Sequence, residues 1–307
     1  MIRRLLAVAR MTLVEAVRSR LLLAIGLVHG AGTAYASLVA ALSLGQEARV
    51  VAEVSLASFS TVALALVVAQ ASTSVDLDIT RKAVLTVLTR ALHRGEWIVG
   101  KYLGILAALF LFGASGAALS VAVIGIVAGT SSRVVLTAGV MVPTALVIAL
   151  PRINALARFT GLVPFAALGV LVALNHNADG AFFARGAALA LIEASLVAAV
   201  ALLFSTFSGP VPTALFTVGV VLVGRSADTL AKLPPRTFPE AVVAFGRALS
   251  RVVPNLHIYV PPRSVLAGFD PHVAPSWLLV QGATYAAAWC VVLLAGAMLV
   301  TDRRDLG

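Results

Sequence analysis

The stretch LLLAIGLVHGAGTAYASLVAALSL, at positions 21–44, contains no Asp, Glu, Lys or Arg. Folded as an α-helix, a segment of this length extends about 36 Å, because each helical residue adds about 1.5 Å. The hydrocarbon core of a bilayer is about 30 Å thick. The stretch therefore predicts a membrane-spanning helix, and its Gly26 and Gly30 have the spacing that lets a second helix approach closely.

The rest of the chain has the same apolar character. Of 307 residues, 60% are hydrophobic and 12% are charged, whereas a soluble domain carries about 25% charged residues to cover its surface. Lipid tails solvate apolar surface directly, so a membrane protein does not need that cover. We therefore expect an all-α integral membrane protein, a polytopic helical bundle in which residues 1–307 form a single transmembrane domain.

Further apolar stretches define the predicted order of spans. Besides 21–44, the core spans are expected at 55–75, 103–130, 186–204, 211–224 (continuing as helix toward Lys232) and 276–300. Two shorter stretches, 134–150 and 160–174, form either two extra spans or one re-entrant hairpin, so the bundle has six or eight spans. The segment 225–275 holds eight of the 13 prolines, which excludes a continuous span there. Short interfacial helices such as 239–251 fit this segment.

The basic residues predict the orientation. The chain has 23 Lys and Arg against 13 Asp and Glu, a formal charge of +10. Fourteen of the 23 lie in four pieces that fall on one side of the membrane, 1–20, 76–101, 151–158 and 301–307. Because basic residues concentrate in cytoplasmic loops, we expect both termini in the cytoplasm and 225–275 outside. Arginines in such short loops act as topology signals and contact anionic lipid, so no nucleic-acid partner is expected.

No pattern for catalysis, a cofactor or a metal stands out. Cys290 is the only cysteine, and the five histidines lack metal-ligand spacing. The segment GEWIVGK, at 95–101, matches the first seven positions of a phosphate-binding loop, but Tyr102 replaces the Ser or Thr that such a loop places on magnesium. We interpret Lys101 as an interfacial anchor, and Gly100 and Gly104 as close-packing positions. No enzymatic activity is predicted for this chain.

Glu193 is the one acidic residue well inside a predicted span. A charge at that depth costs about 2.5–3.5 kcal/mol unless it is paired or faces water. The side chain should therefore face the interior of the bundle. Two interpretations remain open: a polar point on a substrate path or a conformational lock, and a static hydrogen bond to a neighbouring helix or simple protonation.

The N-terminal stretch IRRLLAVARMTLVEAVRSR, at 2–20, is amphipathic and basic. Ile2, Leu5 and Val17 fall near one helical face, while Arg3 and Arg10 lie off it. Such a helix beside a membrane span lies in the headgroup plane, or else it is only the positive flank of the first span.

The charged segment 76–101 carries the most functional information. We expect a surface helix that begins at Asp76 and Asp78, whose carboxylates can cap free N–H groups, and that runs to about Leu92. Arg90 and Arg94 lie near its negatively polarised end. A helix of this kind presents a polar face that is suited to docking a soluble partner.

The string DLDITRKAVLTVLTRALHRGEWIVGKYLG, at 76–104, resembles the cytoplasmic segment of type-2 ABC exporter permeases. That group includes the membrane subunit of nitrous-oxide-reductase maturation transporters. The matching positions are Leu88, Arg90, Arg94, Gly100, Lys101, Tyr102, Leu103 and Gly104, and Ala91 replaces the usual proline. Other pieces agree in order: 2–20 resembles the family's elbow helix, 202–210 its late tight turn, and 253–256 with 303–305 its tail. Residues 134–180 look like an insertion.

The resemblance implies six core spans and a coupling helix at 76–94 that contacts a separate ABC ATPase subunit. It assigns that contact to Asp78, Arg81, Lys82, Arg90 and Arg94. It also implies export across a bacterial inner membrane by a homodimer or a pair of related permeases.

Two other functions remain open from the sequence. One is a secondary transporter that is driven by an ion gradient and uses Glu193. The other is a membrane scaffold that transports nothing. No residue selects a substrate.

Overall fold

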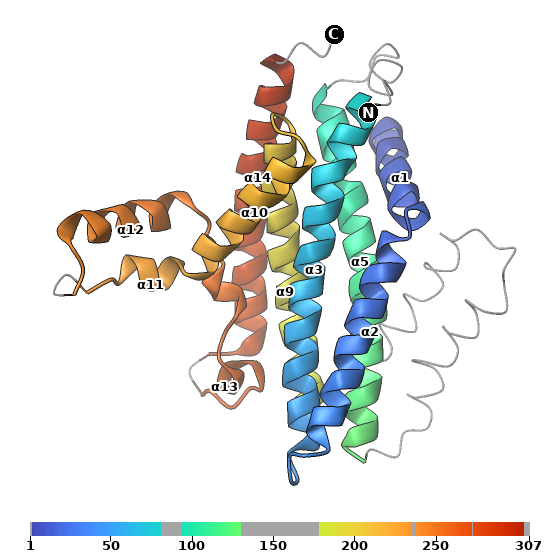
Figure 1. Ribbon diagram of the computed structural model, residues 1–307, viewed down its shortest axis with the longest axis vertical. Helices are drawn as coiled ribbons and strands as arrows, with labels where there is room; N and C mark the ends of the chain where they lie inside the picture. Colours follow the sequence, from blue (N-terminus) through green and yellow to red (C-terminus); the bar gives the residue numbers. More distant parts are fainter. Residues whose placement is uncertain (1, 81–93, 130–177, 235–236, 272, 304–307) are drawn as a thin grey trace, which may run out of the picture.

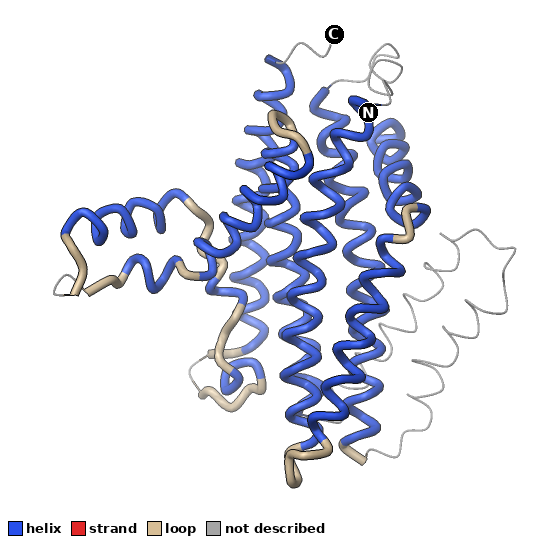
Figure 2. The backbone as a smooth tube through the Cα atoms, viewed as in Figure 1, coloured by secondary structure: helices blue, strands red, loops and turns tan. Residues whose placement is uncertain are grey.

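The computed structural model describes residues 2–80, 94–129, 178–234, 237–271 and 273–303. Within these ranges the chain is all-helical (Figures 1 and 2). The helices are α1 (Ile2–Arg18), α2 (Leu21–Ala40), α3 (Glu47–Thr80), α5 (Arg94–Val127), α9 (Ala178–Ser205), α10 (Pro210–Arg225), α11 (Ala227–Ala231), α12 (Glu240–Val252), the 3-10 turn η2 (His257–Tyr259), α13 (Arg263–Leu266) and α14 (Pro275–Arg303).

Five of the described helices, α2, α3, α5, α9 and α14, are long and apolar enough to cross a membrane. They confirm the helices that the sequence predicts at 21–44, 55–75, 103–130, 186–204 and 276–300. The sixth predicted span, 211–224, is helical, but α10 has only 16 residues, about 24 Å, and is shorter than a hydrocarbon core. The predicted extra spans at 134–150 and 160–174 lie outside the described residues.

Helix α9 is the centre of the bundle. It packs against α3, α5, α10 and α14, and most of its residues are buried. A helix that is apolar all round is expected in such a position. Small residues bring its neighbours close: a Cβ added to Gly186 would lie 2.4 Å from Leu56 of α3, and one added to Gly113 of α5 would lie 2.7 Å from Leu191.

The N-terminal amphipathic helix forms as predicted and packs along α5. A Cβ added to Gly100 would lie 2.7 Å from the Cβ of Val8, and one added to Gly104 would lie 2.5 Å from the Cβ of Thr12. The close-packing role predicted for these two glycines is confirmed. At Gly26, by contrast, an added Cβ meets nothing within 4 Å in the described structure.

The predicted break at residue 76 is wrong. Helix α3 continues through Asp76 and Asp78 to Thr80 without interruption, so these carboxylates do not begin a helix. Neither glycine nor proline occurs between 70 and 80, and helical hydrogen bonding therefore continues beyond the apolar stretch. On the other side of residues 81–93, α5 begins at Arg94.

The ends of α3 and α5 that border residues 81–93 lie at the same end of the bundle as the N- and C-termini (Figure 1). The predicted coupling residues Arg81, Lys82 and Arg90 lie outside the described residues. Asp78 and Arg94 belong to the last turn of α3 and the first turn of α5.

Lys101 is buried between helices and is not the interfacial anchor that the sequence suggested. Its side chain is 1% exposed, and Nζ donates a hydrogen bond to the carbonyl of Ser74 at 3.0 Å. This contact joins α5 to α3 just inside the charged segment. A lysine near the end of an apolar stretch looks the same in the sequence whether it turns outward or inward.

After α10, the chain leaves the bundle sideways. Helices α11 and α12 form a hairpin that projects from the side of the bundle (Figure 1). Helix α12 confirms the helix predicted at 239–251. Its Gly246 packs on α11, because an added Cβ would lie 3.1 Å from the carbonyl oxygen of Leu230.

Candidate functional site

Glu193 is 1% exposed in the middle of α9, which confirms that it faces the interior of the bundle. Its carboxylate accepts two hydrogen bonds from Arg225, at 2.8 Å from Nε to Oε1 and 2.9 Å from Nη2 to Oε2. Two-point pairing of this kind is the geometry that compensates a carboxylate best in a medium of low dielectric.

The same guanidinium reaches a third helix. Nη2 of Arg225, at the C-terminal end of α10, also donates a hydrogen bond to Oγ of Ser60 on α3 at 2.9 Å. One side chain thus joins α3, α9 and α10. We call Glu193, Arg225 and Ser60 the central polar site.

Sequence reasoning found Glu193 but missed its partner. Arg225 begins the segment 225–275, which was expected outside the membrane. One signal was available: Arg225 directly follows an apolar stretch that is too short to cross a bilayer. The last residue of a helix that stops part of the way lies at membrane depth, where an arginine needs an acidic partner.

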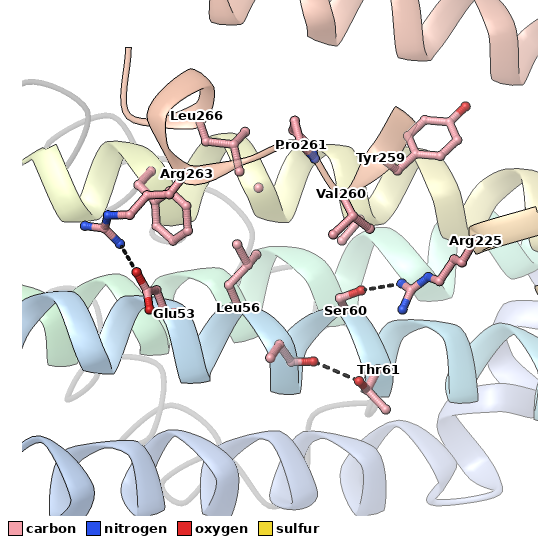
Figure 3. Close-up of a pocket in the computed structure, with 14 residues that line it drawn as sticks. Glu53, Leu56, Ser60, Thr61, Arg225, Tyr259, Val260, Pro261, Arg263 and Leu266 are labelled. Carbon is pink, nitrogen blue, oxygen red and sulfur yellow. Dashed lines mark hydrogen bonds and ion pairs between the residues drawn. The ribbon is translucent and has the colours of Figure 1, made fainter. Parts of the chain in front are cut away.

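A cavity of about 340 Å³ adjoins the central polar site. Its walls come from α3, α9, the end of α10 and the segment 259–266 (Figure 3). Apart from the charged residues and hydroxyls, the lining is apolar and includes Leu56, Phe182, Val260 and Leu266. The cavity therefore offers an apolar space with a few polar groups, which is the usual composition of a small-molecule site.

A second ion-pair group closes the opposite end of this cavity (Figure 3). Arg263 donates from Nη1 to Oε1 of Glu53 at 2.8 Å and from Nη2 to Oδ1 of Asp179. Its guanidinium carbon also lies 4.6 Å from the ring centroid of Phe182. These contacts fasten the segment 259–266 to α3 and α9.

A third polar group, around His29, lies on the far side of α3. Nε2 of His29 lies 3.2 Å from the carbonyl oxygen of Gly116 and 3.0 Å from Oγ of Ser120. Nδ1 lies 3.4 Å from Oγ of Ser58. His29 is 1% exposed and packs edge-on against Phe59. The group links α2, α3 and α5, so its evident role is to hold helices together.

The structure thus assigns no common site to the residues that the sequence singled out. Glu193 belongs to the central polar site, whereas Asp78 and Arg94, the two described residues among those predicted to contact an ATPase, lie at the ends of α3 and α5 on the side of the bundle where both termini lie (Figure 1). Among the described residues, no group of three or more His, Cys, Asp or Glu side chains is placed to hold a metal ion. Comparison of the chain with family models, with curated proteins and with solved structures gave no match, so the interpretation of the site depends on its own geometry.

Proposed function

We propose that this chain is the membrane-spanning subunit of an ABC exporter and that it works with a separate ATPase subunit. In this proposal it acts in a bacterial inner membrane, with both termini in the cytoplasm, as a homodimer or beside a related permease. Binding of ATP closes two ATPase subunits, the segment 76–94 transmits that movement, and the helices change the exposure of an internal path.

The observation that carries the proposal is the sequence of the charged segment 76–101, which resembles the coupling segment of type-2 ABC exporter permeases. The ends of α3 and α5 that border residues 81–93 lie at the end of the bundle where both termini lie (Figure 1). An amphipathic helix before the first span agrees with the elbow helix expected from that resemblance.

Helix α3 offers a mechanical route from this segment to the interior. It is continuous from Glu47 to Thr80, so Asp78 and Ser60 lie about 27 Å apart on one rigid element. Lys101 fastens α5 to α3 beside the charged segment. A displacement at 76–94 would therefore reach Ser60 and, through it, the Arg225–Glu193 pair.

The test is co-purification from native membranes. Charge reversal of Asp78, Arg81 and Lys82 together should abolish recovery of the ATPase. The matched control reverses one acidic and two basic residues on α12, Glu240, Arg247 and Arg251, which are all exposed, and should retain the ATPase. Unchanged complex formation in the first variant would count strongly against a coupling role.

The two alternatives predict different outcomes in the same preparation. A secondary transporter would move substrate as the purified chain without ATP, and Glu193→Gln would abolish that movement. A scaffold would give neither ATPase recovery nor transport. In its pair with Arg225, Glu193 is held by two hydrogen bonds, so a proton carrier at this position would have to break them in each cycle.

A further inference from the structure

One face of α3 lines the cavity beside the central polar site. Glu53, Leu56, Ala57, Ser60 and Thr61 line it, and their spacing of three and four residues gives one face of the helix. Glu53 and Ser60 are separated by about 10 Å along the helix axis. Figure 3 shows Arg263 and Arg225 at the two ends of this face, with Leu56 between them.

The charged side chains that line the cavity are already paired. At one end, Arg225 is paired with Glu193. At the other end, Arg263 forms ion pairs with Glu53, which also lines the cavity, and with Asp179. A ligand that brought its own charge would leave that charge uncompensated next to apolar walls, which is costly. The arrangement therefore favours a neutral ligand.

One nitrogen of Arg225, Nη1, has donors left over at its end of the cavity. The bonds of Arg225 to Glu193 and Ser60 use Nε and Nη2. Nη1 carries two further N–H groups, and within the described part of the chain it makes no hydrogen bond. Arg225 lines the cavity and is 34% exposed. A ligand with an acceptor oxygen can therefore satisfy one of these donors.

We propose that the cavity binds a neutral, mainly apolar molecule that carries a hydrogen-bond-accepting oxygen, such as an ester or amide carbonyl, at one end. The oxygen accepts from Nη1 of Arg225, and the apolar body lies along Leu56 and Ala57 toward Phe182. The volume of about 340 Å³ lies within the range of about 300–1,000 Å³ that is usual for small-molecule pockets. The interpretation of this ligand as a transport substrate depends on the proposed function, but the binding of the ligand does not.

The experiment uses the purified full-length chain in detergent micelles, without any ATPase. Three photoreactive probes share one alkyl chain with a diazirine and differ in the head group: a methyl ester, a carboxylate and a trimethylammonium. Mass spectrometry maps the labelled peptides. The methyl ester should label peptides of α3 and α9 that line the cavity more strongly than either charged probe.

Two variants locate the binding. Ala57 is exposed and lines the cavity, so Ala57→Leu fills space without disturbing the packed interior and should abolish specific labelling. Ala65→Leu is the matched control, because Ala65 is an exposed alanine of the same helix outside the cavity. Arg225→Lys keeps a cation beside Glu193 but loses the forked donor set. It should weaken binding of the ester about 2- to 10-fold, the equivalent of one hydrogen bond.

Two results would overturn the proposal, one from the comparison of the three probes and one from the Ala57→Leu variant. Equal or stronger labelling by the carboxylate or the ammonium probe contradicts a neutral ligand. Labelling by the ester that persists in Ala57→Leu contradicts the location. The experiment is then repeated in phospholipid nanodiscs, where lipid esters can compete with the methyl ester probe. Weaker labelling than in micelles identifies the ester group of a membrane lipid as the natural occupant, and unchanged labelling identifies a free solute. Both results agree with the proposal. If the labelling locates the ligand as expected but no ATPase co-purifies with the chain, this proposal holds and only the proposed function is contradicted.

Discussion

The guanidinium of Arg225 is bonded to both carboxylate oxygens of Glu193, yet the two side chains differ in their surroundings. The carboxylate is 1% exposed, whereas the guanidinium is 34% exposed. Removal of the arginine therefore leaves a charge that is fully enclosed by protein. Removal of the acid leaves a long side chain that can turn toward a more polar region.

This asymmetry predicts unequal effects of the two single substitutions. Arg225→Ala should lower the free energy of unfolding by about 3–5 kcal/mol, the usual result of stranding one partner of a buried ion pair. Glu193→Gln should cost less, because the amide still accepts a hydrogen bond. Equilibrium unfolding in mixed micelles measures both. In the double variant Glu193→Gln with Arg225→Ala, a loss equal to the sum of the two single losses would contradict a direct pair.

Packing of α1 on α5 depends on Gly104. In Gly104→Leu, the new side chain would overlap Thr12 and the carbonyl oxygen of Ala9, which lies 2.7 Å from an added Cβ. We expect α1 to separate from α5 and the protein to lose about 1–3 kcal/mol. The measurement is maleimide labelling of a cysteine placed at Val8, which is buried, in a Cys290→Ala background.

The control for that experiment is Gly219→Leu on α10. An added Cβ at Gly219 meets nothing within 4 Å, so the cysteine at position 8 should stay protected. Equal protection in the Gly104→Leu variant would show that α1 does not need this close approach.

His29→Leu should lower the free energy of unfolding by about 1–3 kcal/mol. The variant loses the bonds of Nε2 to Gly116 and Ser120, and interhelical hydrogen bonds in membranes contribute about 0.6–2 kcal/mol each. His257→Leu is the control, because His257 is exposed and should change little. Unfolding in mixed micelles distinguishes the two, and equal stability of both variants would remove the structural role of His29.

Substitution of Gln70 should raise the free energy of unfolding rather than lower it. Its side chain is 5% exposed, and neither Nε2 nor Oε1 has a hydrogen-bond partner among the described residues. A buried amide without partners costs about 1–3 kcal/mol, so Gln70→Met should stabilise the protein by about 1 kcal/mol in the same unfolding assay. Gln281→Met, at an exposed position on α14, should have no effect. A destabilised Gln70→Met would indicate a partner for this amide in the membrane.

Arg263 holds the segment 259–266 against α3 and α9. Because Glu53 is 44% exposed, the loss of these ion pairs in Arg263→Ala should cost only about 1 kcal/mol. Hydrogen exchange of the backbone amides of Val265 and Leu266 should become about fivefold faster. Arg247→Ala, at an exposed position on α12, should leave these amides unchanged, and unaltered exchange in Arg263→Ala would mean that the apolar contacts alone hold the segment.

The sequence was a good guide wherever one local property decided the outcome. Long apolar stretches predicted the five spanning helices, and the cost of a charge in lipid predicted that Glu193 faces inward. It was a poor guide where the answer depended on a neighbouring helix. The inward turn of Lys101 is decided by the carbonyl of Ser74, and the partner of Glu193 comes from 32 positions away. The continuation of α3 past Asp76 depended on the absence of a helix breaker rather than on hydropathy.

The early end of α10 affects how the membrane crossings of the chain are counted. Within the described residues, five helices are long enough to span, an odd number, yet α1 begins and α14 ends at one end of the bundle, whereas the end of α5 and the start of α9 lie toward the other (Figure 1). The remaining traverse is made in two pieces, first by α10 as far as Arg225 and then by the irregular stretch that leads to α13 and α14 (Figure 1). The amide of Leu256 donates to the carbonyl of Gly224 at 2.9 Å and so caps a helix end that lipid could not solvate. Reporters fused to the two ends of the chain should therefore report the same compartment.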